Sequence, residues 1–181
     1  MNAERLELAL PAPQWETAYL PFVDDFVTAG ESSGAGRNAQ LALSDFAALV
    51  RRLEDDALGI DPAPDRVPSS QYWLLRRDAD GDVTMVGVSH LRHTLTPTLE
   101  DVGGHIGYSV RPSERRRGYG TRILALTLPH ARALGLARVL VTCDTNNIAS
   151  ARVIEKNGGV LASEGYSELA RAHVSRYWIT L

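Results

Sequence analysis

The sequence has a single cysteine, no long apolar run and no internal repeat, and each absence excludes a class of protein. Cys143 is the one cysteine among 181 residues, so an intrachain disulfide and a cysteine-based zinc site are excluded. It lies in a buried-strand pattern, which favours a packed thiol over a nucleophile. No stretch approaches the roughly 18–20 apolar residues of a membrane span. Charges interrupt the first apolar run, MNAERLELAL, so we expect no signal peptide there.

The amino-acid composition and the uneven distribution of charge limit the domain organisation and the kinds of ligand that we expect. The sequence is 44% apolar and 23% charged, which predicts one soluble domain over residues 1–181, in the cytoplasm. Residues 1–110 carry a net charge of −9, and residues 111–181 carry +6. The basic part suits an anionic ligand and the acidic part a cationic amine, although both could be merely solvated surface. We expect no nucleic-acid, membrane or metal partner, since the whole chain is acidic and its arginines cluster in one loop.

That loop, VRPSERRRGYGT at 110–121, is the most informative segment. An apolar strand, HIGYSV, leads into a proline turn, three arginines, Gly-Tyr-Gly and a helical stretch. The glycines allow tight turning, and the unpaired N–H groups of a helix start attract phosphate, so the order predicts a polyphosphate cradle. A P-loop motif is absent, and Ile123 stands where a dinucleotide fingerprint needs its third glycine.

Two motifs give the chain a family resemblance. Arg115, Gly118 and Gly120 form R-x-x-G-x-G, and the segment RVLVTCDTNNIASARVIEKNGG at 138–159 contains N-x-x-S followed by E-K-x-G-G. In this order and spacing they resemble the coenzyme-A loop and the following strand and helix of the GNAT superfamily of N-acetyltransferases. VPSSQYWLL and VGVSHLRHTL narrow the resemblance to a bacterial subgroup of predicted acetyltransferases. The resemblance leaves the acceptor open.

The resemblance implies an α+β fold: a central, twisted, mixed sheet of six to seven strands, splayed between strands 4 and 5 and flanked by about four helices. It also implies acetyl-CoA as co-substrate and direct attack by a primary amine in a ternary complex. The implied coenzyme-binding residues are Tyr108, Val110, Arg115, Arg116, Arg117, Gly118, Tyr119, Gly120, Thr121 and Asn147.

The catalytic residues are less well defined. His105 stands where many relatives carry a catalytic glutamate, and a histidine that titrates near pH 6.5 could be the general base or a structural residue. Glu100 is the second candidate. Many relatives carry a tyrosine that acts as general acid where this chain has Ile154. In relatives that lack it, the serine of N-x-x-S is the proposed substitute, so the resemblance implies Ser150 as general acid. Ser150 could instead cap a helix, and thiolate departure could need no acid.

The acceptor site and the nature of the activity stay open. Candidate substrate-binding residues are Ser69, Ser70, Tyr72 and Arg92. The acceptor could be a small molecule, an amino acid or a peptide, including a ribosomal protein N-terminus. The alternative is a non-catalytic acyl-CoA-binding regulatory module. A homodimer is also left open.

Local patterns predict the remaining elements. Residues 5–11 alternate as a strand, 14–29 have helical spacing, and 31–38 resemble a loop. Ser44 or Asp45 is expected to cap a second helix that ends near Gly59. Asp80-Gly81 predicts a hairpin turn.

Overall fold

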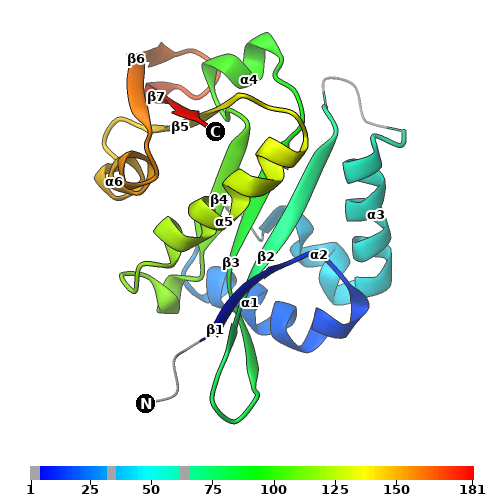
Figure 1. Cartoon of the computed structure of the whole chain (residues 1–181). Helices are drawn as coiled ribbons and strands as arrows, with labels where there is room; N and C mark the ends of the chain where they lie inside the picture. The colour runs from blue at the N-terminus through cyan, green and yellow to red at the C-terminus, as the bar shows by residue number, and fades with distance from the viewer. Residues whose placement is uncertain (1–4, 32–35, 62–65) are drawn as a thin grey trace.

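The computed structural model describes residues 5–31, 36–61 and 66–181, and its strands form two antiparallel sheets (Figure 1). The first sheet has the order β1 (Arg5–Ala9), β2 (Ser69–Arg77), β3 (Val83–Arg92), β4 (Ile106–Val110). The second has the order β5 (Arg138–Asp144), β7 (Ala172–Thr180), β6 (Val160–Ser167). The predicted α+β fold, in which seven strands part between the fourth and the fifth, is confirmed. We expected a mixed sheet, but β4 and β5 are neighbours that form no ladder. All ladders among the described residues are therefore antiparallel.

The described residues contain more helix than the four segments expected. The helices are α1 (Glu16–Thr28), α2 (Gly36–Ser44), α3 (Phe46–Leu58), α4 (Pro97–Asp101), α5 (Tyr119–Ala133) and α6 (Ile148–Lys156), with 3-10 turns η1 (Pro13–Trp15) and η2 (Pro112–Glu114). Two of the six, α2 and α4, were not predicted. α2 begins inside the segment 31–38 that was expected to be a loop, of which 32–35 lie outside the described residues. α4 is too short to give a periodic signal.

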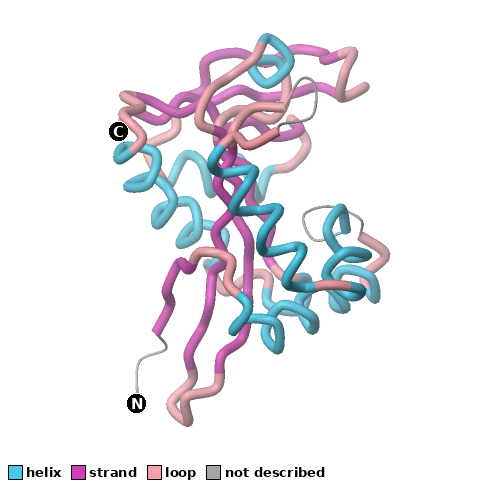
Figure 2. The backbone as a smooth tube through the Cα atoms, turned by 90° about the vertical axis from the view of Figure 1, so that its right-hand side faces the viewer, coloured by secondary structure: helices cyan, strands magenta, loops and turns pink. Residues whose placement is uncertain are grey.

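α1, α2 and α3 cover one face of the first sheet, while α5 covers the other (Figure 2). The side chain of Trp73 on β2 is fully buried, and its ring lies 4.7 Å from that of Tyr19 and 6.0 Å from that of Phe46. Asp45 caps α3 by accepting a hydrogen bond from the Ala48 N–H at 2.8 Å. The first core therefore forms between the amphipathic faces that the sequence pattern indicates.

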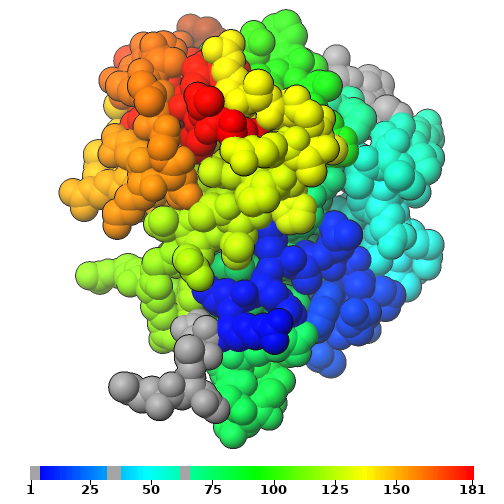
Figure 3. All heavy atoms as spheres, in the orientation of Figure 1, coloured from blue at the N-terminus to red at the C-terminus, as the bar shows by residue number. Residues whose placement is uncertain are grey.

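α5 packs against both sheets, and this shared packing holds them together although β4 and β5 part. Ile123 packs against the first sheet, while Leu124 and Ala131 join a cluster that includes Val141 of β5. In Figure 3 this helix lies across the front of the molecule, between the N-terminal strand and the C-terminal sheet. Pro129 lies inside α5, which continues to Ala133.

The predicted hairpin is confirmed: β2 and β3 pair over their length around a turn that contains Gly81. Among residues 5–31, 36–61 and 66–181, no helix is long and apolar enough to cross a membrane.

Candidate active site

A pocket of about 290 Å³ lies where the two sheets part. One wall comes from the β4 side of the gap and the other from β5, α6 and β7. The lining residues are Arg92, Val102, Gly103, Ile106, Gly107, Tyr108, Thr142, Cys143, Asp144, Asn147, Ser150 and Val174. Two segments that are distant in sequence, 102–108 and 142–150, thus face each other across one cavity.

The closed end of this gap is fixed by main-chain contacts. The His105 N–H donates to the Leu140 carbonyl at 2.7 Å, and the Gly103 N–H donates to Thr142 Oγ1 at 2.9 Å. Between them Gly104 has a φ of +60°, and a Cβ there would lie 2.9 Å from the Leu140 carbonyl carbon. Only glycine accommodates both the left-handed backbone and this close approach.

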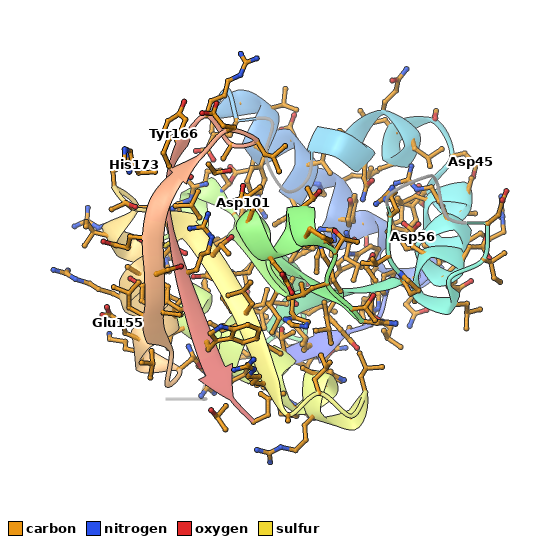
Figure 4. All side chains as sticks on the ribbon, turned by 90° about the horizontal axis from the view of Figure 1, so that it is seen from above. Asp45, Asp56, Asp101, Glu155, Tyr166 and His173 are labelled. Atoms are coloured by element: carbon orange, nitrogen blue, oxygen red, sulfur yellow. The ribbon has the colours of Figure 1, made fainter. Side chains whose placement is uncertain are left out.

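Two arginines hold the segment before β4 against both sheets. Arg92 of β3 donates to the carbonyls of Gly103 and Gly104, each at 3.0 Å. Arg176 of β7 donates to the Asp101 carboxylate at 2.5 Å and, through Nε, to the Asp101 carbonyl at 2.8 Å. Figure 4 shows Asp101 on α4 beside the β6–β7 hairpin. The closed end of the pocket is therefore rigidly held.

Among the described residues, the edge of β4 that faces β5 forms no ladder with a neighbouring strand. Hydrogen-bonded and non-hydrogen-bonded pairs alternate along an antiparallel ladder. Since the N–H groups of Arg92 and Arg111 bond across the β3–β4 pair, Tyr108 and Val110 must direct theirs away from β3. Consistent with this, the Val110 carbonyl accepts from Arg115 Nε at 3.3 Å. The two residues predicted to pair with the pantetheine arm thus have main-chain groups available for it.

The loop after β4 leads into an uncapped helix start. Gly118 is the N-cap of α5 with a φ of +84°, and no side chain caps the helix. The N–H groups of Tyr119, Gly120 and Thr121 fall in the first turn, where helices lack internal partners. An anion can accept these hydrogen bonds, aided by the positive end of the helix dipole.

The three arginines of this loop differ in what they contact. Arg115 forms a bidentate pair with Glu31 at 2.7 and 2.6 Å, and this hydrogen bonding lowers the pKa of Glu31. Arg117 pairs with Glu114 at 2.9 Å. Arg116 is exposed and makes no side-chain hydrogen bond or ion pair with any described residue. Of the three, Arg116 is the one that a phosphate can recruit without breaking an ion pair.

His105 is buried, with 6% of its surface exposed, and it does not line the pocket. Its Nδ1 accepts the Leu140 N–H at 2.9 Å, which requires the ring to be neutral at that nitrogen. Burial, and then the charge of Arg92, lower its pKa. This geometry favours the structural alternative, while the role of general base stays a prediction.

The other predicted base, Glu100, is exposed on α4 and is also absent from the pocket lining. The carboxylate that does line the pocket is that of Asp144, at the end of β5. It also lines a neighbouring open hollow of about 470 Å³, together with Thr145, Asn146 and His173. Sequence reasoning missed Asp144 because a charged residue before an Asn-rich turn is usually only solvated.

Ser150 and Tyr108 meet across the gap. Asn147 caps α6 by accepting the Ser150 N–H at 3.0 Å, so the cap is the asparagine rather than the serine. The Ser150 hydroxyl lies 2.8 Å from the Tyr108 hydroxyl. Burial raises the pKa of Tyr108 to about 12 despite the hydrogen bond to Ser150. Both side chains line the pocket.

Of the four predicted substrate-binding residues, Arg92 lines the pocket. Ser70 lies 2.9 Å from His93 Nε2, and Ser69 begins β2. Tyr72 is buried and stacks on His130 with ring centroids 4.4 Å apart. The structure therefore does not bring the other three into the lining, and their role in acceptor binding stays a prediction.

Cys143 also lines the pocket, and burial raises the pKa of its thiol. It is therefore a neutral, packed thiol, as the strand pattern indicates. Among the described residues, no group of three or more His, Cys, Asp or Glu side chains could hold a metal ion.

The model of the GNAT acetyltransferase domain family matches residues 41–160, which is more than half of the chain. The chain therefore belongs to the GNAT family and is an acetyl-CoA-dependent N-acyltransferase. No curated protein matches it at a significant level.

Solved structures share the fold at low sequence identity. RimJ from Mycobacterium smegmatis, in complex with CoA-disulfide, has a TM-score of 0.67 at 17% identity, covering 97% of this chain and 81% of that one. The microcin C7 self-immunity acetyltransferase MccE, in complex with acetyl-CoA and AMP, has a TM-score of 0.66 at 13% identity, covering 97% and 92%. The ribosomal-protein-S5-alanine acetyltransferase from Vibrio fischeri has a TM-score of 0.67 at 15% identity, covering 99% and 95%.

Proposed function

We propose that the chain, as a single domain over residues 1–181, transfers the acetyl group of acetyl-CoA to a primary amine by direct attack in a ternary complex. The observation that carries this proposal is the pocket between the parted sheets. It joins the open edge of β4, available to the pantetheine arm, to the Asn147–Ser150 segment of α6. The uncapped start of α5 supplies the pyrophosphate site. Acetyl-CoA contributes the activated acetyl group, and the chain's own residues orient it.

Within this proposal the coenzyme-binding residues have distinct tasks. Main-chain N–H groups from Arg116 to Thr121 receive the pyrophosphate, and the exposed guanidinium of Arg116 adds charge. Arg115 adds a further positive charge beside the loop, and its pair with Glu31 ties the loop to the end of α1. Tyr119 contributes its main chain, because its side chain is buried.

We assign the acceptor ammonium to Asp144, the carboxylate shared by the pocket and the neighbouring hollow. There it would hold the amine beside the thioester and accept its proton directly or through water. His105 and Glu100 remain alternatives as base. Asp144→Asn should lower kcat/KM for the amine strongly and leave acetyl-CoA affinity unchanged. His105→Asn keeps an acceptor for the Leu140 N–H, so full turnover in that variant would exclude His105 as base.

Two acceptor classes fit the open hollow beside Asp144. One is a small amine or amino acid. The other is a protein N-terminus, because the hollow opens between the β5–α6 turn and the start of β7, where an extended peptide end can enter. The fold shared with a ribosomal-protein acetyltransferase supports testing this class. We further propose a cytoplasmic bacterial protein, alone or as a homodimer.

Thiol release from acetyl-CoA across matched amine and peptide panels tests the function. Turnover with any acceptor, absent in Asp144→Asn and present in Glu100→Gln, supports it. Tight acetyl-CoA binding without transfer to any amine would instead support the non-catalytic acyl-CoA-binding module.

A further inference from the structure

The hydrogen bond between the Tyr108 and Ser150 hydroxyls has two possible directions. A hydroxyl has one proton to donate and two lone pairs to accept with. The Tyr108 hydroxyl has two acceptors on Ser150: the Oγ at 2.8 Å and the main-chain oxygen at 3.4 Å. The shorter distance is typical of a well-formed O–H···O bond, and the longer one lies beyond the usual range. At 2.8 Å either hydroxyl can be the donor, and the arrangement in which the phenol donates to Ser150 Oγ is the one that keeps the serine proton for a ligand in the pocket.

This arrangement leaves the Ser150 proton free to point into the pocket. Cys143 lies in the same lining, and burial raises the pKa of its thiol, while hydrogen bonding by the Ser150 side chain acts against that rise.

We propose that Tyr108 is a positioning residue whose phenol fixes the Ser150 hydroxyl as a hydrogen-bond donor to the sulfur of coenzyme A. This inference rests on the proposed function and deepens it. As the amine nitrogen bonds to the acetyl carbon, the C–S bond breaks and its electron pair moves to sulfur. The Ser150 O–H donates to that sulfur, while the amine proton leaves to the base and the product thiolate is protonated from solvent.

A comparison of pKa values argues against proton transfer from the Tyr108 phenol to the sulfur. Burial holds the pKa of Tyr108 near 12, whereas a thiol titrates near about 8.5. Transfer from the phenol to the thiolate would thus be uphill by more than three pKa units. The phenol stays protonated and acts by orienting the serine, in place of the tyrosine that relatives carry where this chain has Ile154.

The test uses coenzyme A labelled with ¹³C at the carbon that bears sulfur, so that NMR reports the pKa of the bound thiol without any acceptor. In the wild-type complex we expect this pKa to lie below that of free coenzyme A. Ser150→Ala should raise it by about one unit and Tyr108→Phe by about 0.5 units, the range that one hydrogen bond accounts for. Because Tyr108 acts through Ser150, the double variant should match Ser150→Ala alone.

Tyr166→Phe is the matched control, because Tyr166 is an exposed tyrosine on β6 whose ring lies against His173 (Figure 4). It should leave the thiol pKa unchanged. In turnover, Tyr108→Phe should lower kcat about 2- to 10-fold with an unchanged KM for acetyl-CoA. Thermal melts on each variant show that the fold is retained.

The outcomes separate the two proposals. If coenzyme A does not bind the wild-type chain, the proposed function fails and this inference fails with it. If coenzyme A binds but Tyr108→Phe leaves its thiol pKa at the wild-type value, or the two single shifts add in the double variant, only the role of Tyr108 is refuted.

Discussion

Gly104 should be highly sensitive to substitution, because two independent penalties meet there. Its φ of +60° is a conformation that costs an L-residue about 1 kcal/mol or more. A Cβ would also press against the Leu140 carbonyl, 2.9 Å from its carbon, and overpacking of this kind adds about 1–3 kcal/mol. Gly104→Ala should therefore destabilise the fold by about 2–4 kcal/mol. For a domain of this size that lowers Tm by about 5–15 °C.

Gly135→Ala provides the matched control. Gly135 also has a positive φ, +83°, but a Cβ there would meet nothing within 4 Å. It should lower the free energy of unfolding by only the conformational cost, a Tm change of about 2–4 °C. Calorimetric melts measure the loss of stability in both variants, and titration with acetyl-CoA shows whether the pocket still binds the coenzyme. Equal losses in the two variants would show that the approach of Gly104 to β5 does not hold the sheets together.

Three further predictions concern the coenzyme loop and pH. Gly120→Val should nearly abolish acetyl-CoA binding in calorimetry. The chief reason is that a Cβ at this position would lie 3.2 Å from the Val153 side chain and would force α6 away from α5. Unchanged affinity would refute the coenzyme site. Arg115→Ala should weaken binding less and reduce its salt dependence, and Glu31→Ala should not reproduce the loss of salt dependence. The folded-state pKa of His105 lies below its unfolded value near 6.5, so its contribution to stability is complete above that pH and is lost as pH falls. Melts from pH 7.5 to 5 should show this loss, and His105→Asn should reduce it.

Much of the site could be predicted because its motifs are local. The glycines and arginines of 115–120 act through backbone conformation and helix-end chemistry, which neighbouring residues determine. Asn147 was predicted from the family motif as a coenzyme-binding residue, and the structure shows it as the cap of α6. The seven strands were predictable from alternation and turn residues.

The remaining features depend on which segments meet, and one sequence does not state that. Asp144 resembles any polar residue at a strand end, yet the parting of β4 from β5 makes it part of the pocket wall. Ser69, Ser70 and Tyr72 are predicted acceptor residues, and only the structure shows that Ser70 lies against His93 and that Tyr72 stacks on His130 of α5.

The sequence by itself determined the strands, the main helices and the glycine-containing turn before α5, because periodicity, glycine and helix starts act over a few residues. Only the tertiary structure decided the chemistry of the gap. It buries His105 with Nδ1 bound to Leu140, and it aligns the Tyr108 hydroxyl with Ser150, 42 residues away. Proton affinity and hydrogen-bond partners depend on burial and on side chains brought from distant segments, so they are fixed only when the two sheets close around α5.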